Sequence, residues 1–246
     1  MRASPQAADH QLLHRAVAAL GRRHVGAVAG ILDVAGVEPL ILGTGSLRAP
    51  SGPAPDADTT FEIGSITKTF TALALAQAVV TGRLSLDTPV RDVLPTGTAV
   101  PSRERVEITV EQLARHTSGL PHSPQRLGLR AIWAAGARGE DPYAPISTPV
   151  LLEQVSRTRL RRTPGKGRSR YSNFGAAVLG IALTQIYGKA TYHEMIEDAV
   201  LHPLGLAATT AVGETEAEGH AFRRRPAPNW HLEAALAHCD PRRAIY

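Results

Sequence analysis

One lysine stands out because it follows a serine at a spacing that brings two side chains together on a helix. Of the 27 lysines and arginines in the chain, only three are lysines, and Lys68 is the first of them. It lies three residues after Ser65, so on a helix the two side chains share one face. An amine that can lose its proton, one helical turn from a hydroxyl, suits nucleophilic acyl transfer. We therefore predict Ser65 as a nucleophile. The alternative is a stray surface lysine, because Ser-x-x-Lys alone is a weak signal.

The segment after Ser65 supports this prediction. From Ile66 to Val80 the chain is strongly apolar, and Gly82 follows as a helix stop. Because this helix is apolar on nearly every face, we expect it to be buried. Ser65 then lies at its N-terminus, where the helix dipole favours an alkoxide. Desolvation and the same dipole favour the neutral amine of Lys68 over its ammonium form.

A second motif, Tyr171-Ser-Asn173, contains one of only two asparagines in the chain. A tyrosine hydroxyl can relay a proton, and an asparagine amide can both donate and accept hydrogen bonds. The alternative is a loop tyrosine beside an N-capping Ser or Asn that opens a helix over Phe174–Ile186. Because Ser65 and Lys68 are also present, we favour the catalytic interpretation of this motif.

Four segments in this order resemble the serine β-lactamase-related family, which includes class C β-lactamases, D-alanyl-D-alanine carboxypeptidases and related esterases. The segments are Ser65-Ile-Thr-Lys68, Gln112-Leu-Ala-Arg-His-Thr-Ser-Gly-Leu-Pro121, Pro164-Gly165 leading to Tyr171-Ser-Asn-Phe-Gly175, and Pro203-Leu-Gly-Leu206. The resemblance covers about residues 11 to 215, and the joint set of motifs is highly specific.

The resemblance implies an α/β lobe beside an all-helical lobe, here with an incomplete antiparallel sheet. We expect one domain over residues 1–246, with the nucleophile helix in an α/β part (1–82), then a helical lobe (83–206) and an atypical tail (207–246). The implied enzyme is a serine hydrolase acting on a small amide, β-lactam, ester or D-amino-acid peptide. No cofactor and no metal are implied.

The family also implies a role for each site residue. Ser65 attacks the acyl carbonyl, and its backbone N–H supplies one oxyanion donor. Lys68 and Tyr171 handle the proton, and the sequence leaves open which of them is the base. Asn173 helps to orient Lys68 and the substrate amide.

The chain departs from the family pattern after Pro203. No Lys-Thr-Gly or His-x-Gly occurs there, although the family uses this third motif to close the pocket and complete the oxyanion hole. On the resemblance, the chain corresponds to the first two thirds of an enzyme. We expect weak or absent activity, with a catalytically impaired remnant that acts as a binding protein as the alternative reading.

Composition bounds the remaining possibilities. The formal net charge is +5, and arginines cluster at Arg157–Arg162 and Arg223–Arg225. Nucleic-acid binding is an alternative for these clusters, but no accompanying motif supports it and a solvated face is the preferred reading.

A single cysteine excludes an intrachain disulfide, and the histidines of the tail match no zinc spacing. The N-terminus has no apolar signal segment and nothing reaches transmembrane length, so we expect a cytoplasmic protein.

The predicted elements position these motifs. We expect a helix over 11–22 and a hairpin from strands within 24–33 and 37–47. Pro39 indicates that the second strand is an edge strand or begins late. Helix starts are predicted at Thr88-Pro89, at Thr148-Pro149, and at two capping boxes that begin with Thr109 and Thr191. Residues 121–145 read as an irregular segment, and residues 229–238 as a helix.

Overall fold

The computed structural model describes residues 5–22, 24–32, 39–47, 52–59, 61, 63–124, 146–207 and 209–211. These residues divide into two units. The first takes the described residues up to Ile63 together with those of Leu204–Thr210, and the second those of Gly64–Pro203. The division groups the nucleophile helix with the helices that follow it, whereas the sequence led us to group it with the hairpin.

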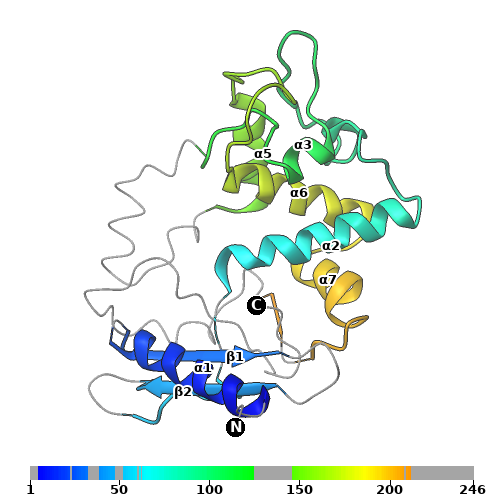
Figure 1. Cartoon of the computed structure of the whole chain (residues 1–246). Helices are drawn as coiled ribbons and strands as arrows, with labels where there is room; N and C mark the ends of the chain where they lie inside the picture. Colours follow the sequence, from blue (N-terminus) through cyan, green and yellow to red (C-terminus); the bar gives the residue numbers. More distant parts are fainter. Residues whose placement is uncertain are drawn as a thin grey trace. The chain divides into compact units, whose positions relative to one another are not determined.

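The first unit contains the predicted hairpin. Strand β1 (Gly26–Ile31) pairs antiparallel with β2 (Leu40–Gly45), in a register that sets Gly26 opposite Gly45. Helix α1 (Pro5–Gly21) packs against both strands (Figure 1). The hairpin is confirmed, and β2 begins directly after Pro39 as expected. The helix begins earlier than residue 11, and both strands are shorter than predicted.

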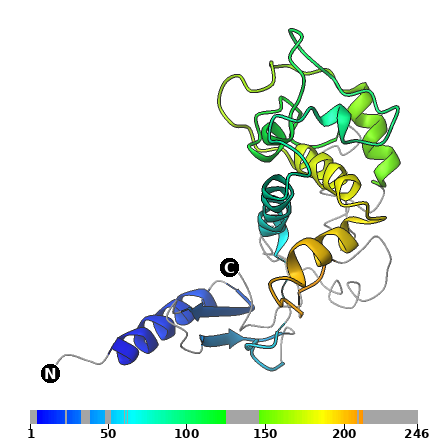
Figure 2. The ribbon, with the colours of Figure 1, turned by 90° about the vertical axis from the view of Figure 1, so that its right-hand side faces the viewer.

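The second unit contains the helices and short turns that carry the candidate site (Figures 1 and 2). In chain order they are η1 (Gly64–Ile66), α2 (Thr67–Val80), η2 (Val90–Asp92), α3 (Val110–Ala114), α5 (Thr148–Arg157), α6 (Asn173–Ile186), α7 (Tyr192–Ile196) and the π-helical turn η3 (Glu197–Leu201).

Helix α6 is the centre of this unit. It contacts α2, α3, α5 and α7. Phe174, Val178 and Ala182 repeat every four residues along it and are at most 1% exposed. Leu179 and Leu183 widen this stripe, and both are also buried. The helix therefore has the broad apolar face that a central helix needs.

The expectation that α2 is buried on every face is wrong. Phe70, Ala74 and Ala78 lie on a buried face, but Leu73 is 43% exposed and Val80 is 86% exposed. The described partners of α2 are η1, α6, α7 and η3. Much of the apolar character of this helix comes from alanine, which reflects helix propensity as well as burial. As a result, Lys68 is only half-buried.

The predicted helix starts are largely confirmed. Thr109 and Gln112 form a complete capping box at α3. At α7, Thr191 caps the Glu194 N–H, but the Glu194 carboxylate accepts from the Ala190 N–H instead of the Thr191 N–H. Pro89 is the N-cap of the 3-10 turn η2 instead of its first helical residue, because it pairs with Thr109 as a β-bridge.

The remaining predicted helix starts also hold. Helix α5 begins at Thr148 with Pro149 in its first turn and ends at Arg157. The Ser172 hydroxyl caps α6 by accepting from the Gly175 N–H, so the capping role considered for this serine is confirmed.

Two further predictions lie outside the described residues. They concern most of the irregular segment 121–145 and the whole of the helix expected over 229–238. Within the described residues, no helix is both long and apolar enough to cross a membrane.

A matched pair of leucines on α2 tests which face is buried. Leu75 is 4% exposed and Leu73 is 43% exposed. Leu75→Ala should destabilise the protein by about 2–5 kcal/mol, because it removes buried apolar volume. Leu73→Ala should cost less than about 1 kcal/mol, because its side chain is half in water already. Urea unfolding of both variants measures the difference, and equal losses would show that both faces are buried.

Candidate active site

Ser65, Lys68 and Tyr171 meet as predicted from the sequence. The Ser65 Oγ lies 2.6 Å from the Tyr171 Oη, and the Lys68 Nζ donates to the Ser65 Oγ at 3.1 Å. The Lys68 Nζ also lies 5.0 Å from the centre of the Tyr171 ring. Since Lys68 donates to Ser65, the single hydroxyl hydrogen of Ser65 is free to point at the Tyr171 Oη. The serine therefore contacts one donor and one group able to accept its proton.

The first two residues are held by the start of α2. Ser65 lies in the η1 turn that runs directly into α2, so its backbone N–H belongs to the first turn, where amides lack helical partners. Hydroxyls from two other segments fix the helix itself. The Tyr187 Oη donates to the Ala74 carbonyl at 2.9 Å, and the Thr71 hydroxyl lies 2.8 Å from the Tyr192 Oη.

Tyr171 is held by the backbone on both sides of it. The Arg170 N–H donates to the His116 carbonyl at 2.9 Å, and the Asn173 N–H donates to the His122 carbonyl at 2.9 Å. Between them, the Ser172 hydroxyl donates to the Pro121 carbonyl at 2.6 Å. We call these three bonds the Tyr171 clamp. Tyr171 itself is 44% exposed, so its position depends on the clamp more than on burial of its ring.

His116 completes the clamp with its side chain. The Ser172 N–H donates to the His116 Nδ1 at 3.1 Å, so this nitrogen is an acceptor and the ring is the neutral Nε2–H tautomer. The imidazole lies against the Tyr171 ring, with centroids 4.7 Å apart. His116 has a φ of 56°, a conformation in which histidine is more common than most residues.

The charges around the site favour a neutral His116 and an acidic Tyr171. Burial, followed by the positive charge of Lys68, lowers the pKa of His116. For Tyr171, burial raises the pKa, but the Lys68 ammonium and the Ser65 hydroxyl together outweigh it and leave the pKa below its usual value. A phenol whose pKa is lowered by a neighbouring cation is better suited to exchange a proton with the serine than an ordinary tyrosine is.

Asn173 opens α6 beside the site, and its backbone is part of the clamp. Among the described residues, its side chain makes no hydrogen bond with Ser65, Lys68 or Tyr171. The predicted role of its amide in orienting Lys68 and the substrate stays a prediction.

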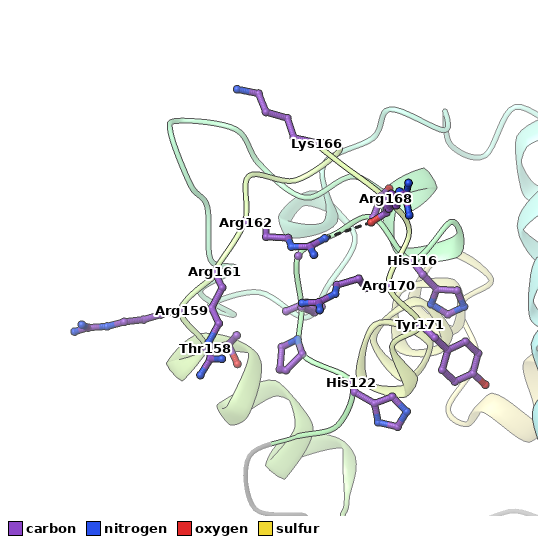
Figure 3. Close-up of a pocket in the computed structure, with 14 residues that line it drawn as sticks. His116, His122, Thr158, Arg159, Arg161, Arg162, Lys166, Arg168, Arg170 and Tyr171 are labelled. Carbon is purple, nitrogen blue, oxygen red and sulfur yellow. Dashed lines mark hydrogen bonds between the residues drawn. The ribbon is translucent and has the colours of Figure 1, made fainter.

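Tyr171 and His116 also line a pocket of about 640 Å³ (Figure 3). Its walls come from two segments, 116–122 and 158–171, that the Tyr171 clamp joins. Gly119 lies where these segments approach each other, because a Cβ there would lie 2.8 Å from the Arg162 carbonyl oxygen. Six of the fourteen lining residues are cations: Arg159, Arg161, Arg162, Lys166, Arg168 and Arg170.

Sequence reasoning missed two parts of this site. His116 lies in the segment Gln112–Pro121 but was given no predicted role. A polar, titratable side chain directly before Thr-Ser-Gly was the available signal for one. The arginines of Arg157–Arg162 are exposed or half-exposed, as the solvated-face reading expects, but that reading did not show that three of them line one pocket. Four cations within Arg159–Lys166 just before the Tyr171 motif were the available signal.

Comparisons with known proteins identify the family of the chain. The family model described as Beta-lactamase matches residues 13–242. The chain belongs to the β-lactamase family, and its fold is of the β-lactamase/transpeptidase type.

Three known proteins illustrate the relationship. Penicillin-binding protein 4 of Amycolatopsis lactamdurans is 42% identical over 204 residues, which cover 78% of this chain and 49% of that protein. The D-alanyl-D-alanine-carboxypeptidase/endopeptidase AmpH of Escherichia coli K12 is 29% identical over 166 residues, covering 68% and 40% respectively. The crystal structure of a β-lactamase/D-alanine carboxypeptidase from Yersinia pestis, complexed with citrate, has a TM-score of 0.75 at 21% identity and covers 97% of this chain and 67% of that one. The chain thus spans less than half the length of these two sequence relatives.

The lowered pKa of His116 predicts how it affects stability. A group whose pKa is lower in the folded state stabilises the fold fully above its unfolded pKa of about 6.5, and this contribution is lost as the pH falls through the folded pKa. His116→Asn keeps an acceptor and tolerance of positive φ but cannot titrate. Between pH 7.5 and 5, the wild type should therefore lose more free energy of unfolding than the variant.

Urea unfolding at the two pH values measures this difference, since the other titrating groups cancel between the two proteins. An equal loss in both would mean that His116 does not titrate differently on folding.

Proposed function

We propose that this protein is a serine hydrolase that works through an acyl-enzyme on Ser65. The observation that carries the proposal is the position of the Ser65 Oγ, 2.6 Å from the Tyr171 Oη and 3.1 Å from the Lys68 Nζ. A nucleophile within hydrogen-bond reach of an acid–base group, which a third group orients, is the arrangement that covalent catalysis uses. Membership of the β-lactamase family supports the same chemistry.

In the acylation step, the Ser65 Oγ forms a bond to the substrate carbonyl carbon. Tyr171 is the general base in this proposal and acts as its phenolate, the form that can accept the Ser65 proton. It is chosen because it is the closer group and its pKa is lowered. The Lys68 Nζ donates to the oxygen of Ser65 and lies over the Tyr171 ring, where it stabilises the phenolate. The backbone N–H of Ser65 donates to the developing oxyanion. When the bond to the leaving group breaks, Tyr171 returns the proton to the departing nitrogen or oxygen.

In the second step, water attacks the acyl carbon. Tyr171 takes the proton of this water, and the ester bond to Ser65 breaks as the proton returns to the Ser65 Oγ. The acid product leaves and Ser65 is regenerated, so no cofactor or metal takes part. The role of Asn173 in this scheme is to bind the substrate amide, because a half-buried side-chain amide at the start of α6 can both donate and accept hydrogen bonds.

The names of two relatives support the proposed substrate class. They are named for D-alanyl-D-alanine carboxypeptidase activity and for penicillin binding. We propose a small amide, β-lactam or ester substrate, with D-amino-acid peptides and β-lactams as the first compounds to assay.

Labelling of the nucleophile tests the proposal. A fluorophosphonate probe should form one adduct, on the peptide that contains Ser65, and Ser65→Ala should abolish it. Ser118 and Ser172 serve as internal controls, because both are 1% exposed serines of the same unit and should stay unlabelled. Peptide mass spectrometry locates the adduct. Labelling of Ser65→Ala at the wild-type level would mean that the reactive serine lies elsewhere.

A further inference from the structure

The pocket beside Tyr171 has a lining of one charge. Six of its fourteen residues are arginine or lysine, and none is aspartate or glutamate. Of these six, Lys166 forms an ion pair with Glu104 at 3.2 Å. None of the five lining arginines forms a salt bridge with a described residue. Five like charges around one hollow repel one another unless an anion lies between them.

Hydrogen bonds between the two wall segments hold the pocket in shape. The Gly165 N–H donates to the Thr117 carbonyl at 2.9 Å, and the Arg170 N–H donates to the His116 carbonyl at the same distance. The Arg162 guanidinium donates to the Arg168 carbonyl at 3.4 Å (Figure 3). These bonds fix the backbone at Gly165 and Arg170 and hold the Arg162 side chain against the Arg168 backbone.

The arginine side chains differ in direction. In Figure 3, Arg162 and Arg170 extend between the two walls, whereas Arg159 and Lys166 extend away from them. Arg161 and Arg170 make no side-chain hydrogen bond or ion pair with any described residue. Planar guanidinium groups bind phosphate and carboxylate with two hydrogen bonds each, so these side chains suit an oxyanion.

The pocket continues the candidate active site. Tyr171 lines it with its ring, and the same residue contacts the Ser65 Oγ through its hydroxyl. His116, which packs on that ring, is a second lining residue and is neutral. One tyrosine thus contacts the Ser65 hydroxyl and borders the arginine-lined pocket.

We propose that this pocket binds a multiply charged anionic group of the substrate, either a phosphate or a pair of carboxylates. The inference rests on the proposed function of Ser65 and names the substrate class of that site. Its volume of about 640 Å³ is that of a small-molecule site. A nucleic-acid surface is a less fitting alternative, because Arg162 and Arg170 extend between the two walls of a hollow instead of along an extended face.

The first experiment measures anion binding without catalysis. Inorganic pyrophosphate is titrated calorimetrically into the full chain carrying Ser65→Ala, and we expect one bound anion per chain. Adding Arg161→Gln and Arg170→Gln should weaken binding at least about tenfold, because each substitution removes a charged donor. The matched control is Arg115→Gln with Arg157→Gln, which removes the same charge from exposed ion pairs outside the pocket and should change binding less than about twofold.

The second experiment links the pocket to Ser65. The kcat/KM for the 4-nitrophenyl ester of phosphonoacetic acid is divided by that for neutral 4-nitrophenyl acetate, in chains that keep Ser65. This ratio should fall at least about tenfold in the Arg161→Gln/Arg170→Gln protein and stay constant in the control. Circular dichroism melting checks that both double variants fold.

Each outcome decides one point. Equal loss of pyrophosphate binding in both double variants, or tighter binding of a single-stranded oligonucleotide than of pyrophosphate, would overturn the inference. If Ser65 cannot be acylated, the proposed function is wrong, and pyrophosphate binding still decides whether the pocket takes anions. If pyrophosphate binds in the pocket but the ester ratio does not change, the pocket is not part of the substrate site and the inference fails while the proposed function stands.

Discussion

The candidate site depends on the clamp that holds Tyr171. The nucleophile and Lys68 are neighbours on one helix, so their proximity follows from local geometry. Tyr171 comes from a loop 106 residues from Ser65, and its ring is too exposed for packing alone to fix it. Backbone hydrogen bonds from Arg170 and Asn173 to the segment 116–122 position its hydroxyl instead. Each bond contributes modestly, but breaking one leaves a backbone group without its partner.

The clamp also explains why the segment Gln112–Pro121 has its particular residues. His116 supplies both a carbonyl and an Nδ1 acceptor, and Pro121 supplies the carbonyl that binds the Ser172 hydroxyl. Gly119 allows the Arg162 backbone to approach. The same contacts that place Tyr171 therefore form the walls of the arginine-lined pocket, so the nucleophile and the pocket share one support.

The sequence predicted the groups that do chemistry better than the groups that hold them. Ser65 and Lys68 are linked by helical spacing, and the hairpin and the caps at Thr109 and Ser172 follow from local patterns. The clamp pairs residues about fifty positions apart, so no local pattern indicates it. The burial of α2 was overestimated because alanine counts as apolar wherever it faces. The arginines were assigned to a surface because composition does not reveal that two segments fold around a hollow.

The central claim is that Lys68 and Tyr171 act on Ser65 as one unit. A double-mutant cycle on the rate of Ser65 acylation by a fluorophosphonate tests it most directly. Tyr171→Phe and Lys68→Ala should each slow acylation by about 10²–10⁴-fold, and the double variant should be no more than about threefold slower than the slower single variant. If the two losses multiply in the double variant, the two residues act independently and the account is contradicted.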